Sequence, residues 1–429
     1  MKIIINKRKK YVVLLLMLII MDVNFMNLID VQRFNIFGIY YTDFVFLVNI
    51  AIVIYQIIKD KFQINNNKSI CFLLLFIGIA ITSAIMGKQT YQQSFFSGLV
   101  AQREWISWML LMYPVYKWIQ KNKITVGEIK QCIIFYCDIY AIICILQYML
   151  YNFVQFTYVT TNVRYGSTRL YFNTIFFCFA IAIVLDQIIN KNQGMIKKII
   201  KLIAYLFVVV VITKGRMQSI SLLFAIMICI ILRRDVPLRK KIMILVVAIV
   251  ALILFFNTTM GQDIVNTIMG VNSENDTLSV RNSGREYYLA LYNKSWKTIL
   301  FGCGFANSHN EIATNILNPL WNDNGTARYY LEDVGIIAPL IRYGLIGIII
   351  WGGIMIRNLL MSYKIYCRSG QMMYLQFLLM DIIASSTLIP TMFNTTILFP
   401  LLTIMILFEY KQLNLGGEKY EFCDGYIKL

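Results

Sequence analysis

Charged residues are scarce in this sequence. Asp, Glu, Lys and Arg make up 14% of the 429 residues, whereas apolar residues make up 59%. Soluble globular domains carry about 25% charged and roughly 45–50% apolar residues, so an ordinary soluble protein is excluded. The sequence also has a single histidine and no carboxylates grouped at ligand spacing, and its nine cysteines show neither a CxxC pair nor a disulfide framework. We therefore expect no bound metal and no cofactor.

Long apolar runs are abundant instead. Their lengths lie near the roughly 20 residues that a helix needs to cross a ~30 Å hydrocarbon core. Backbone polar groups in lipid must be satisfied within the spanning element, which favours helices. We predict an all-α polytopic membrane protein, with a single integral membrane domain over residues 1–429. The first run lacks a small-residue cleavage site, so we expect it to remain as a span. The expected spans lie near residues 11–28, 43–58, 69–86, 103–119, 131–151, 169–188, 199–213, 217–232, 241–257, 334–357, 372–390 and 392–409.

Positive charge is distributed unevenly between the connecting segments. If both ends of the chain are cytoplasmic, the inner segments carry 27 of the 40 Lys and Arg residues, and the outer segments carry 13, although these include the longest loop, residues 258–333. This is the positive-inside pattern. We expect a multi-pass protein of the cytoplasmic membrane with both termini in the cytoplasm. Topology and attraction to lipid then explain the net charge of +18, and we expect no nucleic-acid partner.

The type of cation also changes across the membrane. The inner segments hold 21 Lys and 6 Arg, whereas the outer segments hold 4 Lys and 9 Arg. Recognition of a phosphate or carboxylate favours arginine, because the guanidinium forms two parallel hydrogen bonds and keeps its charge when partly desolvated. The outer face is therefore expected to bind an anion, and scattered loop arginines without a ligand are the alternative. The outer arginines are Arg33, Arg103, Arg164, Arg169, Arg216, Arg281, Arg285, Arg328 and Arg342.

The external loop at residues 258–333 is predicted to be partly helical. Ser283 and Glu286 fit an S-x-x-E capping box, which predicts a helix that begins at Ser283. Arg281 and Arg285 would then lie at a helix N-terminus that is already positive, an arrangement that favours a bound phosphate or diphosphate. Five apolar residues at helical spacing would form its buried face: Tyr288, Leu291, Tyr292, Trp296 and Ile299.

A glycine-rich segment follows this helix and leads to the histidine. Gly302 and Gly304 permit a sharp bend before a second short helix that is expected to begin near Ser308. His309 is flanked by polar residues and lies on the arginine-rich side, so it is a candidate general base or substrate contact. A solvated or structural histidine is the alternative.

Two further outer segments bring cations close to the membrane. Arg164 and Arg169 lie close to the start of the expected sixth span, and the short turn between the seventh and eighth spans carries Lys214, Gly215 and Arg216. A cationic turn at the bilayer surface is expected to face a polar cavity or a ligand, with a solvated turn as the alternative.

One charged pair is expected inside the bundle. Arg342 lies about eight residues into the tenth span, or ~12 Å at 1.5 Å per residue, and Asp381 lies at a similar depth in the eleventh span. Ionisable groups at that depth normally have a partner. We therefore predict an Arg342–Asp381 ion pair, as a helix lock or as the floor of a cavity.

Several motif-like features of the late loop occur in a fixed order. They are Gly284, Arg285 and Trp296; Gly302, Gly304, His309 and Asn310; 333–335 with 343–347; and, earlier, Gly215 with Arg216. With a dozen helices and one large external loop, this order resembles the bacterial O-antigen and capsular polysaccharide polymerases and the related O-antigen ligases. The earlier turn reads KGR here, whereas the family reads more like SRG.

The resemblance implies a glycosyltransferase that acts at the outer face of a bacterial cytoplasmic membrane. The donor would be a polyprenyl-diphosphate-linked glycan, transferred with inversion and without a metal. The resemblance implies His309 as the base, with Glu332 and Asp333 as alternatives. It also implies a chain-length regulator and a flippase as partners. Five arginines would hold the diphosphate: Arg216, Arg285, Arg281, Arg164 and Arg169.

Three other functions remain open. A ligase would use the same chemistry with a different acceptor. A flippase or other transporter would have as many spans, although transporters of this size often consist of repeated halves, which the sequence does not show. A glycosyltransferase that uses a lipid-monophosphate donor would place acids in the first outer loop, where Asp30 and Asp43 are available.

Overall fold

The computed structural model describes residues 7–31, 33–36, 38–60, 68–164, 167–190, 194–233, 237–239, 241–242, 262, 277–307, 310–320 and 328–415. These residues are mostly helical, which agrees with the predicted all-α class. Two short antiparallel hairpins, β1–β2 and β3–β4, are added to the helices.

The first half of the chain forms one series of helices with a hairpin near its start. Its elements are α1 (Lys7–Asp22), α2 (Asn24–Asn27), β1 (Asn35–Ile36), β2 (Ile39–Tyr40), α3 (Tyr41–Lys59), α4 (Lys68–Tyr91), α5 (Phe95–Ala101), α6 (Arg103–Leu110), α7 (Met112–Gln120) and α8 (Val126–Leu150).

The second half adds a hairpin before the buried α9 and a cluster of short helices before α17. Its elements are β3 (Thr161–Arg164), β4 (Ser167–Leu170), α9 (Ile175–Ile189), α10 (Met195–Leu206), the π-helix η1 (Phe207–Ile212), α11 (Arg216–Leu232), α14 (Thr277–Tyr292), α15 (Trp296–Phe301), α16 (Glu311–Leu317), the 3-10 turn η2 (Leu331–Val334), α17 (Ile337–Ser369), α18 (Met373–Ala384), the 3-10 turn η3 (Thr391–Phe393) and α19 (Leu398–Leu415).

Membrane-spanning length is reached by four helices of the described chain: Tyr41–Lys59, Leu74–Tyr91, Val126–Leu150 and Ile337–Ser369. Shorter apolar helices lie at Ile175–Ile189, Met217–Leu232 and Met373–Ala384. These helices support a membrane protein, and the number of twelve spans remains a prediction. The expected fourth span is divided at Leu111, and most of the expected ninth span, residues 243–257, lies outside the described residues.

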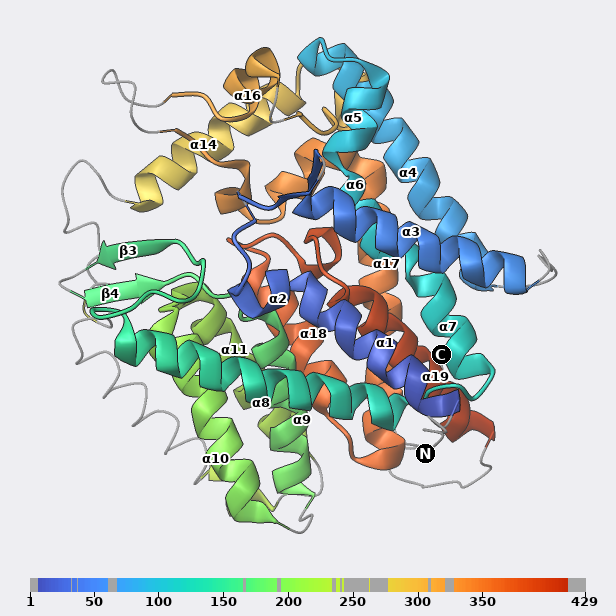
Figure 1. The fold of residues 1–429 in the computed structure, drawn as a ribbon, viewed down its shortest axis with the longest axis vertical. Coiled ribbons are helices and arrows are strands. Elements are labelled where there is room, and N and C mark those ends of the chain that lie inside the picture. The colour runs from blue at the N-terminus through green and yellow to red at the C-terminus, as the bar shows by residue number, and fades with distance from the viewer. Residues whose placement is uncertain are drawn as a thin grey trace.

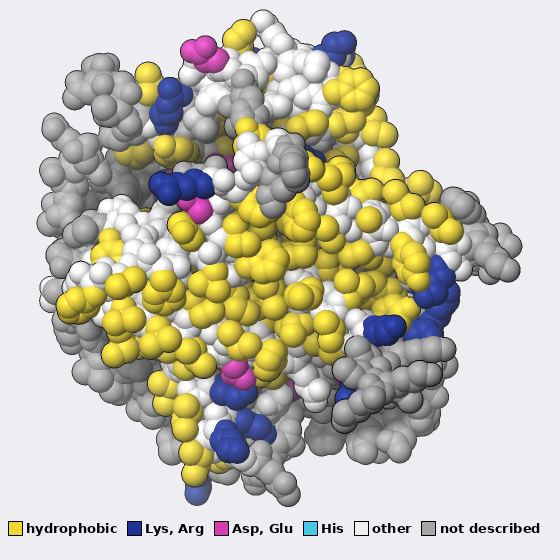
Figure 2. Space-filling model, viewed as in Figure 1, with side chains coloured by type: hydrophobic (Ala, Val, Ile, Leu, Met, Phe, Trp, Pro, Cys, Tyr) yellow, Lys and Arg dark blue, Asp and Glu magenta, His cyan; other side chains and the backbone are white. Residues whose placement is uncertain are grey.

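The short helices of the late loop gather at one end of the molecule. Figure 1 shows α14 and α16 at this end, which we call the loop end, whereas the start of α1 and the end of α19 lie towards the opposite end. Figure 2 shows a broad hydrophobic surface between the two ends, over α1, α3 and α8, with Lys and Arg side chains gathered beneath it. This distribution is consistent with a bundle whose loop end projects from a membrane.

Helix α9 forms the centre of the bundle. Its side chains are buried from Phe176 to Val184, as expected for a helix that is apolar on every side. It packs against α8, α10 and α18, and Phe177 stacks on Tyr140 with ring centroids 5.3 Å apart. The long α8 and the short α18 are therefore fixed against one central helix.

A glycine divides α17 near the loop end. Gly344 has φ 67° and ψ −169° within a helix that otherwise continues to Ser369, a conformation that is essentially restricted to glycine. The segment before it belongs to the loop end, where Ala338 and Ile341 pack with Tyr288 in a separate hydrophobic core. The helix that continues towards the opposite end of the molecule therefore begins at about Gly344.

Candidate functional site

The helix that carries Arg281 and Arg285 is longer than the sequence predicted. It is already helical at Thr277 and continues to Tyr292, so Ser283 lies in its middle and the predicted capping box is wrong. Residues four apart lie on one helix face, which places Arg281 one turn before Arg285. The argument from a positive helix N-terminus therefore does not apply to these arginines.

The predicted buried face of this helix is confirmed in its first part. Tyr288, Leu291 and Tyr292 are buried, and the Tyr288 hydroxyl donates to the carbonyl of Leu317 at 2.7 Å. The chain then turns at residues 293–295, and a new helix starts at Trp296, whose side chain is 64% exposed. Trp296 therefore does not belong to the buried face.

Both arginines of α14 are directed at neighbouring elements. Arg285 Nη2 donates to the carbonyl oxygen of Ser386 at 2.8 Å, just beyond the C-terminus of α18, where a cation is favoured by the helix dipole. Arg281 Nη2 lies 3.7 Å from Asp333 Oδ1, an ion pair on the surface. One arginine therefore contacts the end of α18, and the other contacts one of the two candidate acids.

The predicted Arg342–Asp381 ion pair is wrong. Arg342 pairs with Glu332 at 2.5 Å and stacks over the Phe305 ring at 4.8 Å. Asp381 accepts hydrogen bonds from the backbone and hydroxyl groups of Thr391. The depth estimate failed because Gly344 interrupts the helix two residues after Arg342, so Arg342 belongs to the loop end and not to the bundle interior.

The predicted bend at Gly302 and Gly304 is present, and both residues have positive φ. Cys303, between them, donates its backbone N–H to Ile341 O at 2.5 Å. A Cβ atom on Gly302 would lie 2.6 Å from Gly344 N, so glycine is required where these two segments cross. This crossing fixes the loop segment against the first part of α17.

Gln93 holds the segment that follows the bend. Its side-chain amide donates to Phe305 O at 2.6 Å and accepts from Asn307 N at 2.9 Å. Asn307 in turn donates to Ser97 Oγ at 2.8 Å. We call these hydrogen bonds of Gln93 the Gln93 latch. The sequence did not predict it, because a glutamine more than 200 residues away in the chain gives no local signal.

The predicted base, His309, lies outside the described residues, as does Ser308. The short helix expected near Ser308 begins at Glu311, and Asn310 is its N-cap, whose side chain accepts from Ala313 N. The two alternative bases, Glu332 and Asp333, are about half exposed and each faces an arginine.

The β3–β4 hairpin brings its two arginines to different places. Arg164 is paired with Ser167 at the tip, whereas Arg169 is paired with Asn162 further along the ladder. Arg169 Nε donates to Thr213 O at 2.6 Å, and its guanidinium lies 4.1 Å from the Tyr171 ring centroid. Arg169 is thereby fixed against the turn between η1 and α11.

That turn holds Lys214 in an unusual environment. Its backbone is left-handed, with φ 48°, and it follows a π-helix, a feature that often marks functional sites. Burial, and secondly the positive charge of Arg169, lower the pKa of the Lys214 amine below its ordinary value of 10.5. Arg216 is the first residue of α11. The Arg169 guanidinium and the Lys214 amine are therefore held close together beside the start of α11, a helix of 17 residues.

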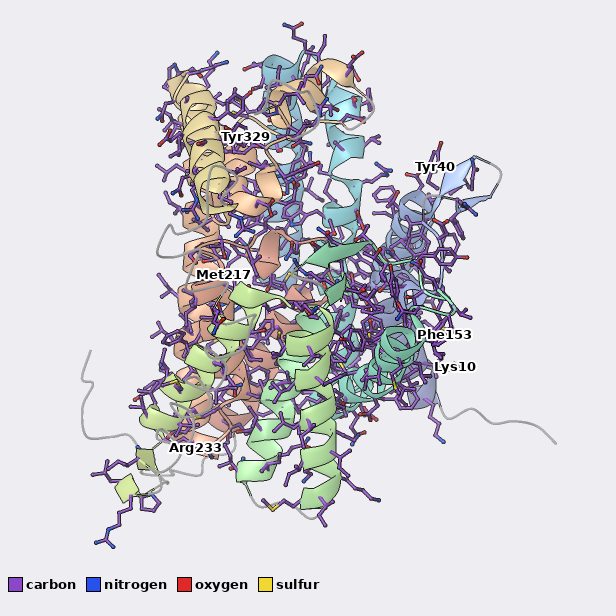
Figure 3. All side chains as sticks on the ribbon, turned by 90° about the vertical axis from the view of Figure 1, so that its left-hand side faces the viewer. Lys10, Tyr40, Phe153, Met217, Arg233 and Tyr329 are labelled. Atoms are coloured by element: carbon purple, nitrogen blue, oxygen red, sulfur yellow. The ribbon has the colours of Figure 1, made fainter. Side chains whose placement is uncertain are left out.

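Helices α11 and α18 form a pair, and the start of α11 lies at the same end of this pair as the contact between Arg285 and Ser386. α11 packs along α18, and Arg233 Nη2, just after α11, donates to Gly370 O, just before α18. The two helices are therefore antiparallel, and their 17 and 12 residues extend about 25 Å and about 18 Å from that tie. Ser386 and Arg216 then both lie at the end of this pair that is far from the tie, and their separation along the helix axis is at most roughly two helical turns. Figure 3 shows Met217 at this height, below α14, and Arg233 at the lower end.

The acids of the expected first outer loop are engaged by other groups. Asp43 forms a 2.5 Å ion pair with Arg103, and Asp30 contacts Arg33 at 3.3 Å. The half-buried Asp22, at the end of α1, accepts from Thr396 Oγ1 at 2.7 Å. Sequence reasoning did not single out Asp22, which has only its position at a helix end to mark it.

Among the described residues, no group of His, Cys, Asp or Glu side chains is arranged to hold a metal ion. Six described cysteines are free and buried, and Cys367 is disulfide-bonded, which the sequence did not predict. No known family model matches this sequence, and a search of curated proteins finds no significant relative.

Proposed function

We propose that this chain is a polysaccharide polymerase that joins polyprenyl-diphosphate-linked repeat units at the outer face of the cytoplasmic membrane. The observation that carries the proposal is the juxtaposition of Arg169 and Lys214 at the start of α11. A pair of cations fixed this close together attracts an anion, because a neighbouring opposite charge favours the protonated form of both side chains. A diphosphate supplies several negative oxygens, and the first N–H groups of α11 add further donors.

Arg285 supports the same assignment from the other side. Its guanidinium donates a hydrogen bond to Ser386, just beyond the C-terminus of α18. Helix α14 therefore brings a cation to the end of the α11–α18 pair at which Arg216 lies. Arg281, one turn earlier, and Arg164, at the hairpin tip, would form the outer rim of the site. Such fixed cations stabilise the charge that develops on a leaving diphosphate, and they do so without a metal.

The proposed reaction is a single displacement at the anomeric carbon of the donor. The acceptor hydroxyl oxygen forms a bond to that carbon, and the bond between the carbon and the diphosphate oxygen breaks with inversion. The hydroxyl proton passes to a base, for which His309 is the first candidate and Glu332 or Asp333 the second. The electron pair of the broken bond leaves with the polyprenyl diphosphate.

Purified protein mixed with a polyprenyl-diphosphate-linked oligosaccharide tests this proposal. We expect elongation of the lipid-linked glycan, and we expect Arg169→Gln, Lys214→Gln and Arg285→Gln each to reduce its rate by about 10²–10³-fold, as for loss of one charge-stabilising group. The matched control is Lys297→Gln, because Lys297 is an exposed outer lysine on α15.

The possible outcomes separate the alternative functions. Elongation that is insensitive to all three substitutions would refute the site. Movement of the lipid across vesicles without elongation would indicate a transporter. Transfer to a single foreign acceptor lipid, without repeated addition, would indicate a ligase.

A further inference from the structure

An apolar cavity of about 310 Å³ lies between α4 and α17, next to the point at which Gly344 interrupts α17. α4 contributes Leu74, Gly78 and Thr82, α15 contributes Phe301, and α17 contributes Tyr343 and Gly347. Both α4 and α17 are long and apolar enough to span a membrane. The cavity therefore belongs to the part of the molecule that we expect to lie next to lipid.

The lining of the cavity suits a hydrocarbon chain. The Thr82 hydroxyl is already used, because it donates to Gly78 O at 2.8 Å. Leu74 is 61% exposed and Ile346 is 38% exposed, so the wall is continuous with the outer surface of the bundle. At ~30 Å³ for each water-sized volume, the cavity accommodates a chain segment of about ten heavy atoms. A sugar would leave its hydroxyl groups without partners here.

Polar groups stand close to one end of the cavity. Arg342 precedes Tyr343 in the chain, stacks on Phe305 and pairs with Glu332, whose side chain is 55% exposed. The buried Tyr343 hydroxyl has no hydrogen-bond partner within the described part of the chain. A chain that occupies the cavity would therefore carry its polar head towards Arg342 and Glu332, at the loop end.

The cavity lies on the other side of the molecule from Lys214 and Arg169. In Figure 1, α11 is on the left and α4 on the right, and in Figure 3 the start of α11 faces the viewer. A polymerase brings together two lipid-linked substrates, and each has its own hydrocarbon chain. We infer that the α4–α17 cavity holds the isoprenoid chain of the acceptor substrate, an inference that rests on the proposed function.

Gly78→Phe tests this inference, because Gly78 lines the cavity and a Cβ atom there meets nothing within 4 Å, so the new side chain enters the cavity from an open position. Gly353→Phe is the matched control, since Gly353 is equally open on α17 and does not line the cavity. The substrates are a donor with its acceptor hydroxyl methylated and an acceptor joined to its lipid through a phosphonate, so that each concentration is varied alone.

We expect Gly78→Phe to raise the KM for the acceptor roughly tenfold, as for loss of about two buried methylene groups. The KM for the donor and the kcat should remain unchanged, and Gly353→Phe should resemble the wild type. An unchanged acceptor KM in Gly78→Phe, with normal elongation, would refute the cavity assignment and leave the proposed function intact.

Photolabelling separates the two proposals. A diazirine-bearing polyprenyl phosphate, added to protein in nanodiscs of phosphatidylethanolamine and phosphatidylglycerol, should label residues 74–82 or 343–350 in the wild type and not in Gly78→Phe. Equal labelling by a diazirine phosphatidylglycerol would overturn the assignment in favour of an ordinary phospholipid chain. Isoprenoid labelling without any elongation would refute the proposed function, and with it the acceptor role, while the lipid site itself would remain.

Discussion

Lys214 provides a test of the anion site at the scale of one side chain. Burial and the neighbouring Arg169 lower its pKa below 10.5, and a bound diphosphate would raise that pKa again, because opposite charge favours the protonated amine. At a pH between the lowered pKa of the free protein and the raised pKa of the complex, the Lys214 amine must take up a proton when the diphosphate binds. We predict that diphosphate affinity falls as the pH rises through this window, measured by titration calorimetry in buffers of different ionisation enthalpy.

The matched variant for this prediction is Lys214→Arg, which stays charged over the same pH range and should lose the pH dependence. The free protein should show the opposite trend in stability. The unfolded chain holds the Lys214 proton more tightly than the folded chain, so the free energy of unfolding rises as the pH rises through the window below 10.5. Identical pH profiles for the wild type and Lys214→Arg would contradict this account.

Gly344 is the residue at which stability should respond most sharply to a methyl group. Its φ of 67° and ψ of −169° are essentially restricted to glycine, and an added Cβ would lie 2.4 Å from both Gly302 N and Leu300 O. We predict that Gly344→Ala lowers the free energy of unfolding by about 2–4 kcal/mol, since strain and a backbone clash act together. Thermal unfolding in detergent measures the change.

Gly352→Ala is the control, because its Cβ would meet nothing within 4 Å in the same helix. Alanine is favoured over glycine inside a helix by roughly 0.5–1 kcal/mol, so this variant should be slightly more stable than the wild type. Two variants of α17 are thus expected to shift the unfolding temperature in opposite directions. A Gly344→Ala protein as stable as the wild type would show that the break in α17 is not required.

At the scale of elements, local patterns were predictive where their cause is local. The bend at Gly302 and Gly304 follows from the backbone freedom of glycine, and the inward face of α14 follows from helical periodicity at Tyr288 and Leu291. The Ser283 capping box failed because a four-residue pattern also fits the middle of a helix. The Arg342 depth failed because counting residues assumes an unbroken helix, and Gly344 breaks this one.

The partners of the outer charges could not be predicted at this scale. The Arg342–Glu332 pair depends on the path of the chain between η2 and α17, and the Arg285 contact with Ser386 depends on the docking of α14 on α18. Such contacts are set by tertiary packing, for which one sequence gives no periodic signal. The arginine bias of the expected outer segments indicated an anion site, but it did not indicate which groups each arginine contacts.

The latch at Gln93 connects α5 and the late loop, and its removal should loosen one segment. Gln93 is 5% exposed, and both ends of its amide are bonded to residues 305–307. We predict that Gln93→Ala leaves a buried donor and acceptor unsatisfied, each worth about 1–3 kcal/mol. Amide hydrogen exchange at residues 303–307 should therefore speed up.

The control for this latch is Gln89→Ala, because Gln89 is exposed on the same end of α4. Its exchange profile at residues 303–307 should match the wild type. Exchange that is unchanged in Gln93→Ala would show that the crossing of Gly302 and Gly344 alone holds the loop. A global rise in exchange would instead assign Gln93 to the stability of the whole loop end.

At the scale of the whole molecule, the open question is how many times the chain crosses the membrane. Twelve crossings follow from the apolar runs and the charge bias, whereas four described helices have full spanning length. Helices such as α9 and α18 are shorter, because the hairpin β3–β4 and the turns around Ser386 use residues that were assigned to spans. Short apolar helices can still span if the bilayer thins locally, so helix length does not decide the number of crossings. The side of the membrane on which each loop lies is a better test, because it shows whether the number of crossings between two loops is odd or even.

Three exposed positions show whether the number of crossings around the expected ninth span is odd or even. Met195 and Leu238 are separated by two expected crossings, 199–213 and 217–232, whereas Leu238 and Trp296 are separated by one, 241–257. Single cysteines at these positions, in a background without Cys71, Cys367 and Cys423, can be labelled by a maleimide that does not cross membranes. All three native side chains are more than half exposed, so the reagent can reach them.

We predict that Trp296→Cys is labelled on intact cells, and that Met195→Cys and Leu238→Cys are labelled only after the membrane is permeabilised. Labelling of both Leu238→Cys and Trp296→Cys only after permeabilisation would remove the ninth span and make the number of crossings odd. The loop end would then lie on the same side as the lysine-rich segments, and the outer-face polymerase would be excluded. Positive-inside bias makes the predicted pattern the expected one, because Met195 and Leu238 both adjoin lysine- and arginine-rich segments.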